Sequence, residues 1–162
     1  MNREVINGQL QHHWAGATGG VALFERVGRT HGDEAAAATV SRLAVEIGED
    51  REALRAIMHA VGVEPSTLGA MTARAGEWVG RFKPNGRIVS RSPLSDVLEL
   101  EALRIAVSGK RSGWQVLREL ADREPRIDAG EMDRLLERAD AQLETLRETH
   151  LRVALERVLE QS

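Results

Sequence analysis

The chain of 162 residues contains no cysteine and no tyrosine, and only two phenylalanines and three tryptophans. Without thiols, it cannot form a disulfide framework, a thiolate metal site or a cysteine nucleophile. Strand-favouring aromatic residues are scarce and helix-forming residues are abundant, so the composition predicts an all-α protein with an aliphatic core. Because a chain of this length fits one ordinary domain, we expect residues 1–162 to form a single helical-bundle domain.

The sequence also lacks a long apolar run and a strong excess of charge. It has no stretch of about 18 apolar residues, and its first residues lack the layout of a signal peptide. The formal net charge of −3 gives no reason to expect a nucleic-acid partner. Lysine is rare, since Lys83 and Lys110 are the only lysines among 22 basic residues. We therefore expect a cytoplasmic protein that binds neither membranes nor nucleic acid.

Four long segments show the apolar spacing of three and four residues that is typical of amphipathic helices. They cover about residues 5–29, 33–61, 92–124 and 128–159, with a break or kink expected at residues 108–113. The connection between the second and third segments has about thirty residues and includes a shorter amphipathic stretch at residues 65–82. A connection of that length lets two of the four helices run parallel.

Short polar and small residues mark the ends and weak points of these segments. Asp33 precedes the second helix as an N-cap, and Gly32 and Gly62 are expected to stop the first and second helices. Glycines at positions 16, 19 and 20 weaken the first helix, since each costs roughly 1 kcal/mol relative to alanine. Small residues at that spacing can instead allow a close helix crossing.

Acidic residues interrupt two of the apolar stripes. Asp50 stands where the stripe of residues 33–61 demands an apolar residue, one helical turn from Glu46. In the third helix the expected core-facing stripe is Leu94, Val97, Leu98, Glu101 and Ile105, so Glu101 also occupies a stripe position. A buried carboxylate is strongly unfavourable unless it is paired, so we expect nearby cations and amides to neutralise these acids. The predicted internal polar network comprises Glu46, Asp50, Arg51, Glu99, Glu101, Lys110, Arg138 and Gln142.

Several short phrases add a resemblance that extends over nearly the whole chain. They are Glu46-Ile47-Gly48-Glu49-Asp50-Arg51, Asn85-Gly86-Arg87, Ser92-Pro93-Leu94-Ser95, Glu99-Leu100-Glu101 and Gly109-Lys110. With the helical layout, they resemble an uncharacterised actinobacterial family of the ferritin-like superfamily. The resemblance implies a ferritin-like four-helix bundle with an extra helix in the long crossover between helices two and three. Metal-binding members of that fold use Glu-x-x-His pairs, and none of the five histidines here follows a glutamate at that spacing.

These observations leave more than one function class open. The preferred interpretation is a non-enzymatic structural or interaction module, a homodimer without a cofactor, in which the polar network replaces a di-iron site. Trp78 and Phe82 are expected to form an exposed apolar contact of that dimer. The alternative is a carboxylate-rich protein that handles iron or manganese, or an oxidase. Its candidate ligands are Glu25, Glu46, Asp50, Glu101 and His150. A third, weaker hypothesis is a pocket for a small polar ligand held by the same arginines and carboxylates.

Overall fold

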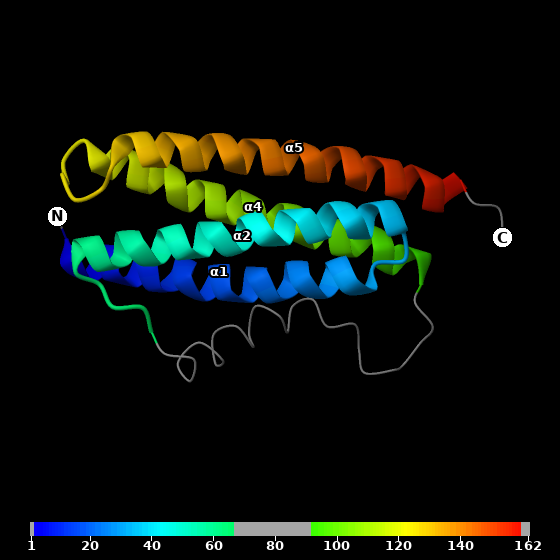
Figure 1. The fold of residues 1–162 in the computed structure, drawn as a ribbon, viewed down its shortest axis with the longest axis horizontal. Coiled ribbons are helices and arrows are strands. Elements are labelled where there is room, and N and C mark those ends of the chain that lie inside the picture. Colours follow the sequence, from blue (N-terminus) through cyan, green and yellow to red (C-terminus); the bar gives the residue numbers. More distant parts are fainter. Residues whose placement is uncertain (1, 67–91, 160–162) are drawn as a thin grey trace.

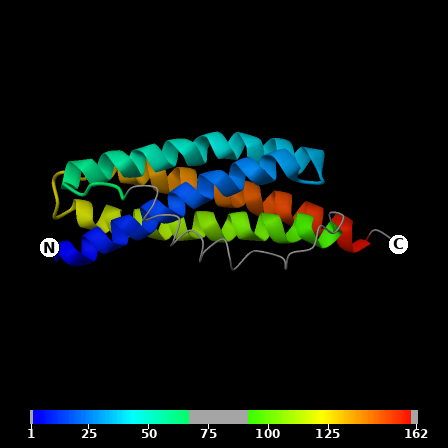
Figure 2. The ribbon, with the colours of Figure 1, turned by 90° about the horizontal axis from the view of Figure 1, so that it is seen from below.

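The computed structural model describes residues 2–66 and 92–159, and all regular structure in these ranges is helical. The four helices are α1 (Arg3–Thr30), α2 (Glu34–Val61), α4 (Pro93–Ala121) and α5 (Ala129–Leu159). They lie side by side in one elongated bundle (Figures 1 and 2). The prediction of an all-α bundle is confirmed for these residues. The helix expected within residues 65–82, and with it Trp78 and Phe82, lies outside the described part beyond residue 66.

The helix directions follow from the colours of Figure 1. α1 and α5 run one way along the bundle, whereas α2 and α4 run the other way. α1 packs extensively against α2, and α4 against α5, while α1–α4 and α2–α5 contacts are fewer. The bundle therefore consists of two helical hairpins, and the chain leaves α2 at one end of it and enters α4 at the other. No helix in residues 2–66 and 92–159 is both long and apolar enough to cross a membrane.

Capping residues fix the ends of α1 and α2. The Asp33 carboxylate accepts a hydrogen bond of 2.7 Å from the backbone amide three residues later, as expected of an N-cap. Gly62 ends α2 with a left-handed φ of 79°. Gly32 stands where predicted, directly after the C-cap His31 of α1, but it is not left-handed, because Gly62 is the one described residue with positive φ. The His31 amide donates to the Val27 carbonyl oxygen at 2.8 Å.

α4 contradicts the sequence prediction in two ways. It runs without interruption through residues 108–113, where a break was expected, because Gly113 and Trp114 are buried there and tertiary packing offsets the glycine cost. Its core-facing stripe is also a different one. Leu94, Leu98 and Ile105, expected in the core, are between 50 and 60 % exposed. The buried positions are instead Asp96, Leu100, Leu103, Val107, Trp114 and Leu117.

The interior consists of two apolar clusters with a polar layer between them. One cluster contains Leu10, Leu54, Trp114 and Met132, from all four helices. The other contains Phe24, Ile47, Val107 and Leu146. Between these two levels the core positions of α2, α4 and α5 are occupied by Asp50, Lys110 and Gln142, and α1 supplies glycines. The candidate functional site is this middle layer.

Candidate functional site

Asp50 is the centre of the polar layer. Its side chain is only 2 % exposed, and its two carboxylate oxygens accept hydrogen bonds from three side chains on two other helices. Lys110 of α4 donates to Oδ2, and Arg138 of α5 donates to Oδ1. Gln142 Nε2 donates to Oδ2 at 3.3 Å. A buried carboxylate is tolerated when cations and amide donors surround it in this way, so Asp50 ties α2 to both α4 and α5.

Gln142 completes the layer, and its amide group is fully used. The side chain is 1 % exposed, and its oxygen accepts a hydrogen bond from the Lys110 ammonium. Its Nε2 also donates to Glu46 Oε2 at 2.9 Å. At the edge of the layer, Arg138 donates to Glu49 Oε2 at 3.0 Å. The structure thus brings together five of the eight predicted network residues, namely Glu46, Asp50, Lys110, Arg138 and Gln142.

The Lys110 ammonium lies between the oxygens of Asp50 and Gln142. Burial lowers the pKa of Lys110 from its ordinary value of 10.5, and the Asp50 carboxylate opposes that shift, while the nearby Arg138 guanidinium adds to it. Two of its three N–H groups are accounted for by these two acceptors. An ammonium held between a carboxylate oxygen and an amide oxygen occupies the kind of environment that a bound cation would otherwise fill.

Three predicted network residues lie elsewhere. Arg51 donates to its neighbour Glu52 at 3.0 Å, whereas Asp50 accepts its hydrogen bonds from side chains of α4 and α5. Glu99 and Glu101 are on α4 but about 16 and 14 Å from Lys110 along the helix axis, at 1.5 Å per residue. The structure therefore does not bring these three residues into the layer around Asp50.

The five candidate ligands of the alternative metal-binding hypothesis do not converge on one point. Glu25 is exposed on α1, whereas Glu46 and Asp50 are bonded within the polar layer. His150 is buried near the far end of α5, where Arg104 donates to its Nδ1 at 2.9 Å. Because an arginine only donates, Nδ1 is the acceptor and Nε2 carries the proton. Glu101 Oε1 is 3.4 Å from that nitrogen, at ion-pair distance but without hydrogen-bond geometry.

A second polar cluster, which the sequence analysis did not predict, lies where α1 ends and α4 begins. His31, Asp96 and Glu99 each place one potential metal-ligand atom within 4.8 Å of the others. Asp96 is 4 % exposed; its Oδ2 pairs with Arg157, and its Oδ1 accepts from the Gly32 amide at 3.1 Å. In the sequence, the one feature that indicates this cluster is the spacing of Asp96, which lies on the same helical stripe as Leu100 and Leu103.

The hydrogen bonds of His31 show what this cluster does. The Asp33 amide donates to Nδ1 at 3.1 Å, so Nδ1 is an acceptor, and Nε2 then donates to the Asp96 carbonyl oxygen at 3.0 Å. Both ring nitrogens are therefore occupied, and neither lone pair is free for a metal ion. The cluster joins the α1–α2 turn to the start of α4 and, through Arg157, to the end of α5.

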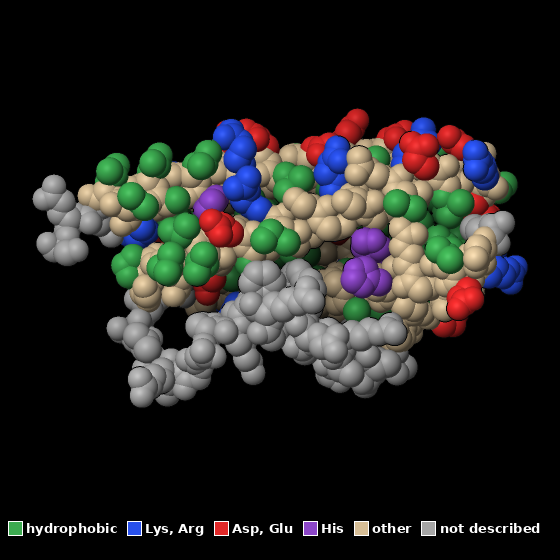
Figure 3. Space-filling view, turned by 180° about the vertical axis from the view of Figure 1, so that it is seen from behind, with side chains coloured by type: hydrophobic (Ala, Val, Ile, Leu, Met, Phe, Trp, Pro, Cys, Tyr) green, Lys and Arg blue, Asp and Glu red, His purple; other side chains and the backbone are tan. Residues whose placement is uncertain are grey.

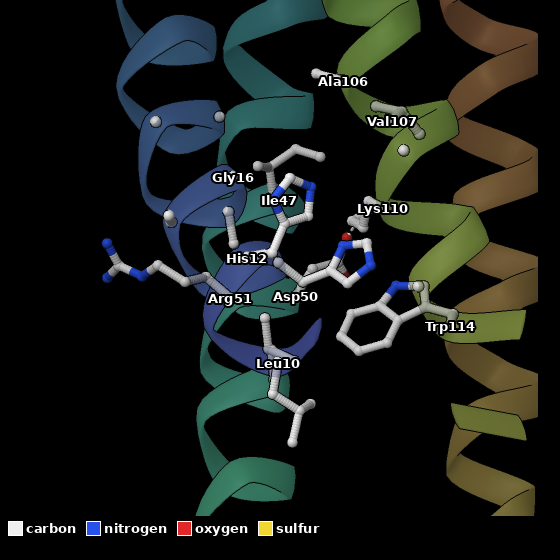
Figure 4. A pocket seen from close by; sticks show the side chains of 18 of the residues that line it. Leu10, His12, Gly16, Ile47, Asp50, Arg51, Ala106, Val107, Lys110 and Trp114 are labelled. Carbon is white, nitrogen blue, oxygen red and sulfur yellow. Dashed lines mark hydrogen bonds and ion pairs between the residues drawn. The ribbon is translucent and has the colours of Figure 1, made fainter. Parts of the chain in front are cut away.

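A cavity of about 260 Å³ opens beside the polar layer, between α1, α2 and α4 (Figure 4). Asp50 and Lys110 form part of its wall, and Trp114 directs its indole ring into it from α4. His13 lines it from α1, and burial, with a smaller effect of His12, lowers the pKa of His13 from 6.5. His13 is therefore neutral at pH 7, and the Asp50–Lys110 pair gives the polar wall no uncompensated charge.

The glycines of α1 border this cavity and do not mediate a close helix crossing. A Cβ added at Gly16, Gly19 or Gly20 would meet no atom within 4 Å in the part of the chain that the structure describes. By contrast, a Cβ at Gly28 would approach the Cα of Ser41 at 3.2 Å, so α1 and α2 do pack closely there. The spacing of the glycines at positions 16, 19 and 20 can be seen in the sequence, but whether they allow a close crossing depends on which helix lies opposite them in the fold.

Comparisons with known proteins found no matching family model, no matching curated protein and no matching solved structure. The resemblance to the ferritin-like superfamily therefore stays a prediction, and the function has to be inferred from the geometry of the site.

Proposed function

We propose that this protein is a non-enzymatic structural or interaction module, a ferritin-like bundle in which an internal network replaces the di-iron centre. The position of Lys110 is the observation that carries the proposal. Its ammonium donates hydrogen bonds to Asp50 Oδ2 and to the Gln142 side-chain oxygen at the middle of the bundle. Arg138 donates to the other carboxylate oxygen of Asp50. Two fixed cations neutralise the buried carboxylate, so an added divalent ion would meet repulsion and few free oxygens.

The direction of the helices supports the ferritin-like part of the proposal. α2 and α4 run the same way, so the chain between residues 66 and 92 has to connect opposite ends of the bundle. One long crossover of this kind distinguishes ferritin-like bundles from simple up-down bundles. In such folds the metal ligands project into the bundle core, and Asp50, Lys110 and Gln142 likewise lie at core positions here.

The donor set does not fit the alternative, a centre of two iron or manganese ions. Such centres take carboxylates and imidazoles that converge from four helices. In the described residues Glu25 is exposed, Glu101 is beside His150, and both are away from the Asp50 layer. His31 and His150 each use Nδ1 to accept a protein hydrogen bond.

Metal analysis of the full chain tests the proposal. Protein purified without a chelator, and protein incubated anaerobically with ferrous iron or manganese and then desalted, should contain well below one metal ion per chain by mass spectrometry. A stoichiometric metal content in either sample would overturn the proposal. An excess of metal that disappears on mild washing would count as surface binding, since exposed acids are common on all four helices.

The interaction part of the proposal rests on an exposed apolar face. We define the α4–α5 apolar face as Leu94, Leu98, Ile105, Leu151, Leu155 and Val158, which are between 45 and 77 % exposed. Figure 3 shows hydrophobic side chains gathered on the end of the bundle where α4 begins and α5 ends. A large contiguous patch of exposed apolar side chains is typical of a site that contacts another protein. The predicted contact through Trp78 and Phe82 lies outside the described residues.

A second copy of this chain is the partner we propose for the α4–α5 apolar face. Glu101 lies on the same α4 stripe as Leu98, and Arg147 precedes Leu151 by one turn of α5, where it also pairs with Glu144, so charges of both signs border the face. A two-fold axis can bring Glu101 of one copy to Arg147 of the other, because an isologous interface pairs each patch with itself.

Light scattering during size-exclusion chromatography tests the dimer. The wild-type chain should elute with twice the mass of 17.8 kDa, and Leu98→Glu or Leu155→Glu should elute as a monomer with an unchanged helical spectrum. Val45→Glu is the matched control, because Val45 is 65 % exposed on α2, away from this face. A monomeric wild type at micromolar concentration would contradict the homodimer, and dimers of both glutamate variants would exclude this face.

A further inference from the structure

The imidazole ring of His13, on α1, lies directly over Gly113 of α4. A Cβ built on Gly113 would be 2.8 Å from Cε1 of that ring, 2.9 Å from Nε2 and 3.0 Å from Nδ1. The ring therefore occupies the place that a side chain at position 113 would take, and we call this place the Gly113 seat. Gly113 is buried, and α1 packs less extensively against α4 than against α2. The contact between α1 and α4 thus depends on a titratable ring that lies against a helix backbone.

The neutral form of His13 is the one that fits the Gly113 seat. Burial lowers the pKa of the ring from 6.5, and the neighbouring His12 ring, whose centroid is 5.5 Å away, adds to this shift. A protonated ring in the seat would lose hydration that nothing nearby replaces, unless an acid without a partner lay beside it.

The charged side chains around His13 supply no such acid. In the described residues these and the other titratable groups are His12 on α1, Asp50 and Arg51 on α2, Glu64 after α2, and Lys110 and Arg111 on α4. Asp50 already accepts from two cations, and Glu64 is 85 % exposed and pairs with His59 at 3.4 Å. Lys110 and Arg51 line the same cavity as His13, so a charged ring would share that wall with two cations.

The position of α1 is independent of the buried charges. The hydrogen bonds of the polar layer join α2, α4 and α5 only. Close to His13, α1 is bonded instead to the chain that follows α2. Gln11 Nε2 donates to the Glu64 carbonyl oxygen at 2.7 Å, and Trp14 Nε1 donates to the Ser66 carbonyl oxygen at 3.3 Å. A movement of α1 away from α4 can therefore keep these bonds and the polar layer.

We propose that His13 in the Gly113 seat is a pH-sensitive latch between α1 and α4. The neutral ring holds the two helices together. Its protonated form leaves the seat for solvent, and α1 then moves away from α4 while the polar layer stays intact. This conformational role goes beyond the structural role proposed for the polar layer.

Distances between spin labels on the full chain test the latch. The chain has no cysteine, so labels attach only to cysteines that are introduced. The test pair, Val5→Cys with Val116→Cys, joins exposed sites on α1 and α4. The reference pair, Val45→Cys with Val116→Cys, joins exposed sites on α2 and α4. Double electron–electron resonance should show a longer distance for the test pair when the pH is lowered from 7.5 to 5, and an unchanged distance for the reference pair.

The size of the response follows from proton binding. An open ring has the ordinary pKa of 6.5, whereas the closed ring has a lower one, so the open form binds more protons below pH 6.5. The ratio of the longer to the shorter distance should therefore rise by up to about tenfold per pH unit between 6.5 and the pKa of the closed form.

Four variants assign the response to the seat. His13→Leu keeps an uncharged side chain there and should not respond to pH, whereas His12→Leu changes the exposed neighbour and should respond. Gly113→Ala places a Cβ where the ring lies, so it should show the longer distance already at pH 7.5. Gly109→Ala is its control on the same helix, because a Cβ there meets no described atom within 4 Å. If His13→Leu does not fold, His13→Gln is the second uncharged variant.

Four results would each overturn the proposal. One is a test-pair distance in the wild type that is the same at pH 7.5 and pH 5. Another is a pH response of the folded uncharged His13 variant that equals that of the wild type. A third is a Gly113→Ala protein with the wild-type distance at pH 7.5. The last is an equal lengthening of both label pairs, which would mean that the whole bundle loosens in acid.

Discussion

Asp50→Ala is expected to destabilise the fold far more than the loss of an exposed acid. The carboxylate accepts hydrogen bonds from Lys110, Arg138 and Gln142, and no other acid in the layer contacts both cations. Without it, an ammonium and a guanidinium face each other in a poorly solvated space, where Arg138 already acts to lower the pKa of Lys110. The Gln142 amide also loses one of its acceptors.

The magnitude follows from burial. Removing one partner of a buried ion pair costs roughly 3–5 kcal/mol. The side chains of Lys110 and Arg138 keep 15 and 30 % exposure, so water partly solvates them and the lower end, about 3 kcal/mol, is expected. For a domain of this size, a loss of about 3 kcal/mol lowers the melting temperature by roughly 6–12 °C. Glu52→Ala is the control; Glu52 is 42 % exposed, and its surface pairs are worth about 0–1 kcal/mol.

Urea and thermal unfolding at pH 7, followed by circular dichroism, measure both variants. A third variant, Asp50→Ala combined with Lys110→Met, should recover part of the loss, because it leaves fewer uncompensated charges in the interior. Equal melting temperatures for Asp50→Ala and Glu52→Ala would refute the buried network. Lys110→Met alone completes the comparison. If the double variant loses as much free energy of unfolding as Asp50→Ala and Lys110→Met lose together, Asp50 and Lys110 do not interact.

Two further predictions concern pH. Burial lowers the pKa of Lys110, and Lys83 is the only other lysine, so ¹⁵N-lysine spectra should show the Lys110 ammonium deprotonating below pH 10.5. Between its folded pKa and 10.5 the unfolded chain binds more protons, so the contribution of Lys110 to stability should rise with pH in that window. Arg152 lowers the pKa of Asp33 from 3.8 to about 2, a shift worth about 2 kcal/mol. This stabilisation is present above pH 3.8 and should be lost as the pH falls towards 2. Urea unfolding across that range should show a smaller loss in Arg152→Met than in the wild type, because the variant keeps only the hydrogen bond from the Ala36 amide and the influence of His31.

The helices of the first hairpin could be predicted closely because each carries one unambiguous stripe. On α2, apolar residues at every third or fourth position leave Asp50 as the single exception, and the structure buries it. The N-cap at Asp33 and the stop at Gly62 depend only on local backbone chemistry, so the sequence indicates them directly. The stop at Gly32 was also indicated, but not its conformation, because the Gly32 amide is bound by the side chain of Asp96, a residue distant in sequence.

α4 could not be predicted as well, because it carries two apolar stripes. One passes through Leu94, Leu98 and Ile105, and the other through Leu100, Leu103 and Val107. Both have helical spacing, so periodicity alone does not tell which stripe faces the core. The second continues to Leu117 and the first does not, and a longer apolar stripe buries more surface. The exposed first stripe then becomes the candidate contact surface.

The sequence predicted that acids, cations and an amide would meet inside the bundle, but it did not predict all of the residues that do so. The position of Asp50 on an apolar stripe indicates a buried charge, and Lys110 is one of only two lysines in the chain. Only the fold shows that the second cation bound to Asp50 is Arg138 and not Arg51. Helix geometry excludes Glu99 and Glu101 from the layer, since eleven and nine residues correspond to about 16 and 14 Å. The His31–Asp96 cluster needed tertiary information, because its members are separated by 65 positions in the sequence.

The polar layer and the cavity divide the bundle into a fixed part and an adaptable part. Four helices with similar aliphatic stripes could slide by one heptad at small cost, but Asp50, Lys110 and Gln142 satisfy one another in one register only. These residues belong to α2, α4 and α5, and α1 contributes none of the hydrogen bonds of that network. α1 is held mainly by its packing on α2, and it faces α4 across the cavity with glycines. It follows that a shift of α1 relative to the other helices breaks no hydrogen bond of the polar layer.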